Sequence, residues 1–160
     1  MKKYEFTGET KQVELLFRTV TLHRIKAVAE FGIVKVGDLG GWIEKEENLS
    51  HDGKAWVYGN AKVWGDAKVW GNAKVWGDAE VFSISHVLVI GPIGSRNDFT
   101  TFFRDKDSEI TVKCGCFLGK IDKFLEKVCE THGDSKYAIV YRSAVEIAKQ
   151  QIDLSEKKQL

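Results

Sequence analysis

The sequence carries almost no net charge. Its 24 Lys and Arg residues oppose 23 Asp and Glu residues, the formal net charge is +1, and both signs are spread along the chain. Proteins that bind duplex DNA or an anionic membrane carry a basic face. We therefore expect neither nucleic acid nor a membrane among the partners.

Long apolar runs are missing too. No run approaches the ~20 apolar residues that span a bilayer, and the first residues, MKKYEFTGETKQVE, lack the apolar core of a signal peptide. Cys114, Cys116 and Cys129 are odd in number, and such thiols stay reduced inside a cell. The sequence therefore predicts a cytoplasmic protein with free thiols.

What the sequence does have is a strict internal repeat between Val57 and Val81. The chain reads VYGNAK, VWGDAK, VWGNAK and VWGDAE, so valine, alanine and a Gly-Asn or Gly-Asp pair each return every six residues. This period fits neither a helix nor a single strand. Each unit instead combines a short extended piece with a pair of residues that tolerates turns.

The repeat resembles that of the hexapeptide-repeat family, whose chains coil as a left-handed parallel β-helix with three units per turn. Weaker units continue the phase on both sides, which gives about nine units and about three coils on the family's geometry. The resemblance implies that Val and Ala fill the interior and that residues eighteen apart stack, with Tyr58 above Trp76 and Trp64 above Phe82.

Regular elements are also indicated outside the repeat. Thr19–Ala27 reads as a strand, and the glycine-rich 36–43 as a turn that leads into the repeat. After the only proline, Pro92, residues 99–104 and 109–115 predict a hairpin. Two amphipathic helices follow, one ending near Thr131 and one starting near Ser135.

We therefore expect a mainly β chain with α structure at its C-terminus. Three parts are predicted: an N-terminal strand and cap (1–38), a left-handed parallel β-helix of about three coils (39–92) and a small ββαα unit (93–160).

Large aromatic side chains occupy the second position of each repeat unit. On the family's geometry this position faces outward, and exposed apolar patches of that size are avoided by monomers. We expect these rings to form a homo-oligomer interface, to pack within the chain or to wall a pocket between subunits. They are Tyr58, Trp64, Trp70, Trp76 and Phe82.

A polar segment after the repeat is the candidate ligand site. It concentrates two guanidinium groups, hydroxyl and amide side chains and glycine N–H donors, which suit phosphates or planar polar rings. The alternative is a capped turn whose polar groups satisfy their own backbone. The candidate residues are Ser95, Arg96, Asn97, Asp98, Thr100, Thr101 and Arg104.

The sequence supports catalysis or metal binding less well than it supports ligand binding. Hexapeptide acyltransferases use a histidine as general base, and of the four histidines only His51 and His86 lie in the repeat region, neither beside an orienting carboxylate pattern. Cys114, Cys116, Cys129 and His132 contain zinc-ligand types at an irregular spacing. We expect no catalytic residue, no metal and no cofactor.

The whole chain also resembles small uncharacterised phage and prophage hexapeptide-repeat proteins. The resemblance rests on Arg24 to Ala27, Gly37 to Trp42, the repeats, Gly94 to Asn97 and Cys114 to Phe117. It implies a homo-oligomer in the host cytoplasm that sequesters a phosphorylated or cyclic nucleotide signal of host immunity. The alternatives are a hexapeptide-type acyltransferase and a structural assembly module.

Overall fold

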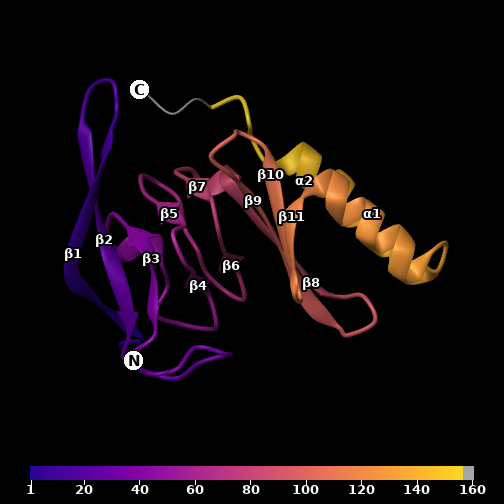
Figure 1. Ribbon diagram of the computed structural model, residues 1–160, viewed down its shortest axis with the longest axis horizontal. Coiled ribbons are helices and arrows are strands. Elements are labelled where there is room, and N and C mark those ends of the chain that lie inside the picture. Colours follow the sequence, from indigo (N-terminus) through magenta and orange to yellow (C-terminus); the bar gives the residue numbers. More distant parts are fainter. Residues whose placement is uncertain (157–160) are drawn as a thin grey trace.

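The molecule consists of a long hairpin, a stack of short strands, an antiparallel sheet and a pair of helices, arranged in sequence order (Figure 1). The computed structural model describes residues 1–156. Its elements are β1 (Tyr4–Glu14), β2 (Thr19–Ala27), β3 (Leu39–Ile43), β4 (Trp56–Val57), β5 (Lys62–Val63), β6 (Lys74–Val75), β7 (Glu80–Val81), β8 (Val87–Ile93), β9 (Asp98–Arg104), β10 (Ile110–Cys114), β11 (Phe117–Lys120), α1 (Ile121–His132) and α2 (Lys136–Gln151).

The N-terminal hairpin covers one end and one side of the repeat. β1 and β2 pair antiparallel, β2 pairs antiparallel with β3, and the hairpin tip extends past the rest of the molecule (Figure 1). The predicted strand Thr19–Ala27 is confirmed as β2. β1 was not predicted, because most of its side chains are exposed and its sequence carries little apolar alternation.

The glycine-rich segment before the repeat begins with the expected turn, at Val36 and Gly37, but most of it is the strand β3. Gly40 and Gly41 lie in β3, between β2 and the repeat. A Cβ on Gly40 would lie 2.6 Å from Ile25, and one on Gly41 would lie 2.6 Å from the carbonyl oxygen of Ala61. The two glycines therefore let β3 approach its neighbours more closely than any other residue would.

Repeat units eighteen residues apart pair as parallel strands. Lys62 pairs with Glu80, Trp56 with Lys74, and Val57 with Val75. The valines and alanines of the units lie in one buried core. The expected ring stacking is confirmed: the ring centroids of Tyr58 and Trp76 are 4.0 Å apart, and those of Trp64 and Phe82 are 5.0 Å apart.

The expected fold class, a left-handed parallel β-helix of about three coils followed by a ββαα unit, is nevertheless wrong. The described strands form a five-stranded mixed sheet (β1-β2-β3-β5-β7), a four-stranded antiparallel sheet (β11-β10-β9-β8) and a two-stranded parallel sheet (β4-β6). The parallel strands are two residues long because each unit turns at its glycine, whose φ lies near 60°. The hairpin adds antiparallel pairing through β2 and β3, and β8 pairs antiparallel with β9. The repeat pattern encodes neither pairing.

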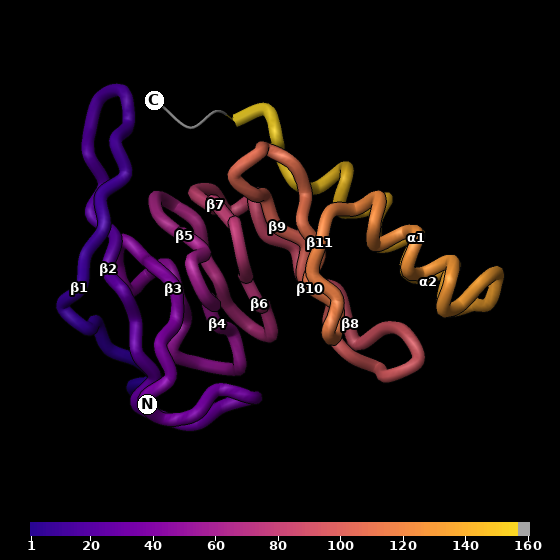
Figure 2. Tube along the Cα trace, viewed as in Figure 1, coloured from indigo at the N-terminus to yellow at the C-terminus, as the bar shows by residue number. Residues whose placement is uncertain are grey.

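The C-terminal unit is larger than the predicted hairpin and helices. β9 and β10 form the expected hairpin, but β8 and β11 flank it, and α1 and α2 lie side by side on the face turned away from the repeat (Figure 2). Gly133 ends α1 with a positive φ of 56°, as expected. Phe103 of β9 packs into the repeat core while its neighbour Phe102 packs under the helices, so one strand serves both cores.

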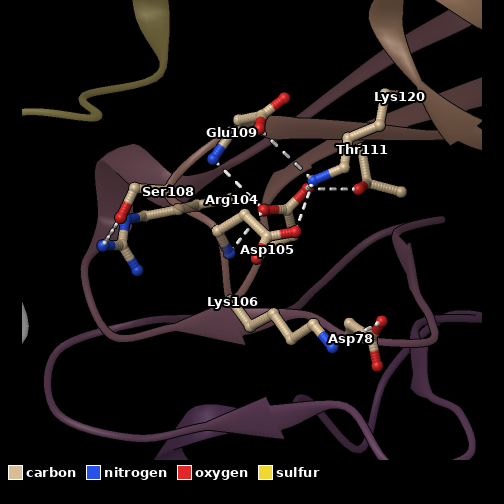
Figure 3. Close-up of polar contacts among 9 residues, drawn as sticks. Asp78, Arg104, Asp105, Lys106, Ser108, Glu109, Thr111 and Lys120 are labelled. Atoms are coloured by element: carbon tan, nitrogen blue, oxygen red, sulfur yellow. Dashed lines mark hydrogen bonds and ion pairs between the residues drawn. The ribbon is translucent and has the colours of Figure 1, made fainter.

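The turn between β9 and β10 fastens this unit to the last repeat layer (Figure 3). The buried carboxylate of Asp105 accepts hydrogen bonds from Thr111 Oγ1 at 2.7 Å and Lys120 Nζ at 2.9 Å. Burial opposes ionisation, but these hydrogen bonds outweigh it and hold the pKa of Asp105 below its ordinary value. Beside it, the backbone N–H of Lys106 donates to the carbonyl of Asp78 at 2.9 Å.

A buried histidine lies beneath the C-terminal segment. His86 is 0% exposed, its Nδ1 accepts the N–H of Phe82 at 3.1 Å, and its Nε2 lies 3.5 Å from a carboxylate oxygen of Glu156 without a hydrogen bond. Burial, with a contribution from the Arg104 guanidinium, lowers the pKa of His86 from 6.5 to about 4, although Asp153 opposes the shift. The imidazole is therefore neutral at pH 7.

Replacing Gly41 by alanine should destabilise the fold strongly, because the new methyl group would meet the backbone of Ala61 rather than a flexible side chain. We expect a loss of about 1–3 kcal/mol or more, as for other overpacked positions, and about 2–4 °C of Tm per kcal/mol. Thermal unfolding followed by circular dichroism measures the shift. Ser143→Ala, on the exposed side of α2, serves as control and should leave Tm nearly unchanged.

The stability of the protein should fall in mild acid because of His86. Its folded pKa is lowered, so its contribution is fully present above about pH 6.5 and is lost as the pH falls from there through about 4. At about 1.4 kcal/mol per pKa unit, the loss is on the order of 3 kcal/mol. Urea unfolding between pH 7.5 and 4 measures it, and His86→Gln should show a clearly flatter profile. Equal slopes for both proteins would contradict this assignment.

Candidate functional site

A cleft of about 200 Å³ opens in the C-terminal unit, on the side away from the repeat. It lies between the loop that joins β8 to β9, the turn that joins β10 to β11, and α1. Its lining residues are Ser95, Arg96, Asp98, Cys114, Gly115, Cys116, Phe117, Phe124, Lys127, Val128, Thr131, His132 and Tyr141.

The floor of the cleft is aromatic and rigid. Phe124 of α1 is buried, its ring centroid lies 5.4 Å from that of Phe117 in β11, and it meets Tyr141 of α2 edge-on at 5.7 Å. Such edge and tilted contacts add to the stabilisation from burial alone. A planar group of a ligand would therefore rest on side chains whose positions are already set.

Tyr141 is held in place by the β8–β9 loop. Gly94 has φ 79°, a conformation that favours glycine. A Cβ at this position would also overlap the Tyr141 hydroxyl, so there is no room for a side chain. Burial, followed by the nearby Cys114 thiol, raises the pKa of Tyr141 to about 12. The phenol therefore stays protonated at neutral pH and can donate a hydrogen bond.

The rim of the cleft carries two positive charges. Arg96 reaches it from the loop, and Lys127 from α1. Within residues 1–156, neither side chain has a carboxylate oxygen within 4.0 Å, although Asp98 also borders the cleft. Ser95 and Thr131 add hydroxyl groups. The rim thus offers charge-assisted donors for an anion such as a phosphate.

The structure brings together only part of the predicted ligand site. Ser95, Arg96 and Asp98 border the cleft. Asn97 lies in the same loop with φ 50°, and it does not line the cleft.

Of the four predicted site residues on β9, Asp98 is exposed, and the other three are buried and have structural partners. Thr100 donates to Cys114 Sγ at 3.4 Å, and Thr101 accepts the N–H of Lys74 at 3.0 Å. The Arg104 guanidinium donates to Ser108 Oγ at 2.7 Å and lies 4.7 Å from the Phe82 ring centroid. The contacts of Thr101 with Lys74 and of Arg104 with Phe82 join the sheet to the repeat, and none of the three residues lines the cleft.

Sequence reasoning missed the helical side of the cleft. Lys127 and Thr131 lie three and seven residues after Phe124, at the edge of the apolar face of α1. Polar residues at these spacings border an amphipathic stripe, and this signal is present in the sequence. What the sequence does not show is that this edge lies opposite the loop with Arg96.

The cysteines do not meet to form a metal centre. Cys114 and Cys116 border the cleft, whereas Cys129 is exposed and does not line it. His132 stacks on Tyr141 with ring centroids 5.7 Å apart. Over residues 1–156, no group of three or more His, Cys, Asp or Glu side chains is arranged to hold a metal ion.

The two histidines of the repeat region have different surroundings. His86 is enclosed, as described above. The His51 ring stacks on Tyr4 at 4.2 Å, its Nδ1 accepts the N–H of Lys3 at 3.1 Å, and its Nε2 lies 3.8 Å from a carboxylate oxygen of Glu46. With 29% of its side chain exposed, His51 is the repeat-region histidine that a substrate can reach.

Four of the five repeat aromatics are covered within the chain. The hairpin residues Val13, Val20 and Leu22 pack with Trp64 and partly cover Phe82. On the next side, Tyr58 is 9% exposed, and Lys113 Nζ lies 4.8 Å from the ring centroid of its stacking partner Trp76. Trp70 differs from the others, because 70% of it is exposed.

Comparison with known proteins gives one partial relative and no family. No protein-family model matches the chain. The chain is similar to a protein of Escherichia coli (strain K12) described as the uncharacterized acetyltransferase YdcK, with 34% identity over 62 residues. The match covers 36% of this chain and 19% of that protein, so the chain spans about a fifth of the relative's length. It agrees in part with the hexapeptide-repeat resemblance and gives no link to phage proteins.

The helices add one general observation. Neither α1 nor α2, nor any other described helix, is long and apolar enough to cross a lipid bilayer.

Proposed function

We propose that the protein is a non-catalytic binding protein for a small phosphorylated ligand with a planar ring, a nucleotide or cyclic nucleotide, which it holds in the cleft between the β8–β9 loop and α1. One observation carries the proposal: the two cations of the rim, Arg96 and Lys127, lack carboxylate partners within residues 1–156 and flank an aromatic floor.

The chemistry of the cleft matches the two halves of such a ligand. The Arg96 fork and the Lys127 ammonium group suit phosphate oxygens, and the hydroxyl groups of Ser95 and Thr131 add donors. The exposed edge of the Phe117 and Tyr141 floor suits the ring. Ligand pockets commonly measure about 300–1,000 Å³, so a cleft of about 200 Å³ encloses one end of the ligand and leaves the rest outside.

The biological role that follows is sequestration. In this role the cleft binds its ligand and returns it unchanged, and the thiols of Cys114 and Cys116 and the imidazole of His132 border the cleft without reacting with the ligand. The resemblance to small phage proteins supplies the setting, in which removal of a nucleotide signal from the host cytoplasm protects the phage.

Acyl transfer is the second candidate, and the partial match to an acetyltransferase favours it. In that case His51 is the residue to test as general base, since it is the exposed histidine of the repeat region. Its Nδ1, which accepts the N–H of Lys3, would have to give up that hydrogen bond to take a proton from a substrate. Fold or sequence similarity over part of a chain does not by itself carry an activity. The cleft favours ligand binding over acyl transfer, because its two cations, which have no carboxylate partner within residues 1–156, can bind an anion as they stand.

Nucleotides should stabilise the folded protein, and Arg96→Ala should remove this effect. A ligand at about 100 times its Kd adds about 2.7 kcal/mol, which corresponds to a rise of roughly 5–10 °C in Tm for a chain of this size. Cyclic AMP, cyclic di-AMP and ADP are the probes, and thermal unfolding is the measurement. The Tm of unliganded Arg96→Ala should match that of the wild type, because the side chain is exposed.

Two lysines on the same helix provide a matched control. Lys127→Ala should weaken binding about tenfold or more, the loss expected for one charge-assisted hydrogen bond. Lys123→Ala should not, because Lys123 lies outside the cleft and pairs with Glu126 at the surface. If none of the three nucleotides moves the wild-type Tm at millimolar concentration, the binding proposal is wrong.

The acyltransferase candidate makes a separate prediction. Wild-type protein should release free coenzyme A from acetyl-coenzyme A in the presence of an acceptor hydroxyl or amine, and His51→Ala should lower the rate by about 10²–10⁴-fold, the usual contribution of a general base. Recovery of an unchanged nucleotide from the wild type, with no coenzyme A release, favours sequestration. If the wild type neither binds a nucleotide nor releases coenzyme A, the structural assembly module is the function that remains.

A further inference from the structure

The third side of the repeat bears an open apolar groove of about 700 Å³. It lies between the middle repeat layer and the start of β8. Trp70, Ile84, Val89 and Phe99 give it an apolar surface, and Glu47 and Lys68 border it. Trp70 is 70% exposed and Ile84 is 64% exposed, so two large apolar side chains project into solvent at one place.

This groove differs from the other two sides of the same repeat. The Trp64 and Phe82 side is covered by the β1–β2 hairpin, and the Tyr58 and Trp76 side is covered by Lys113 and the core around it. No described segment covers Trp70 in the same way. Stable monomers rarely leave a contiguous apolar surface open, so a second molecule is the expected cover.

The charges on the groove indicate which molecule this is. Glu47 and Lys68 are both exposed, have opposite signs and lack an ion-pair partner within residues 1–156. A two-fold axis turns each surface onto a copy of itself, so a two-fold interface must be complementary to itself. A groove with one free acid, one free base and an apolar centre meets this condition: Lys68 of each copy can face Glu47 of the other.

We propose that the Trp70 groove is the interface of a two-fold symmetric homodimer, with Trp70 and Ile84 at its centre and reciprocal Lys68–Glu47 pairs at its edge. The cleft with Arg96 shares no lining residue with this groove. The proposal is therefore independent of the ligand that the cleft takes.

Sedimentation equilibrium of the full chain tests the dimer. Wild-type protein should have twice the mass of one chain at micromolar concentration, and Trp70→Lys should be a folded monomer. Phe17→Lys is the matched control: Phe17 is an aromatic residue at the hairpin tip, 82% exposed and outside the groove, so this variant should remain a dimer. Circular dichroism checks that every variant is folded.

Charge reversal tests the pairing. Lys68→Glu and Glu47→Lys should each raise the dimer dissociation constant about tenfold or more, because each places like charges opposite each other twice. The double variant should return to within about threefold of the wild type. A wild-type monomer or trimer, a Trp70→Lys dimer, dissociation of Phe17→Lys, or a double variant weaker than either single variant would each overturn the proposal.

Discussion

A turn with positive φ every six residues is the constraint on which the rest of the structure depends. The repeat glycines Gly59, Gly65, Gly71 and Gly77 all have φ near 60°, a conformation that side chains with a Cβ rarely adopt. Because each turn is alike, the valines and alanines return to the interior and the aromatic residues return to the outside at regular intervals. The parallel strands can then be only two residues long, and their stability comes from stacking rather than from strand length.

Stacked layers leave both ends of their core open, and the segments before and after the repeat close them. At one end β2 and β3 pack against Trp56, with the paired glycines allowing the close approach. At the other end Phe103 of β9 enters the repeat core while Phe102 enters the core under the helices. The candidate cleft is therefore built on a sheet that is itself fastened to the repeat, although most of its lining residues come from loops and from α1.

Patterns within one segment were predictable from the sequence, and partnerships between distant segments were not. The strand Thr19–Ala27, the β9–β10 hairpin and the two helices follow from local periodicity, and the stacking of rings eighteen residues apart follows from the resemblance to hexapeptide repeats. Most of β8 falls within the range predicted for the repeat, 39–92, but β8 pairs antiparallel with β9 instead. The same holds for the cleft: Arg96 was a candidate from its loop, whereas Lys127 and Tyr141 join it only after the helices pack on the sheet.

The stacking period of eighteen residues also determines which changes in repeat length the fold can accept. Because units eighteen residues apart lie above one another, inserting eighteen residues of repeat would lengthen the stack and keep the hairpin and the antiparallel sheet in the same relative orientation. Inserting six residues would instead set the units that follow against different partners, because the pairing joins units eighteen residues apart. Natural variation in length is therefore expected to come in whole layers.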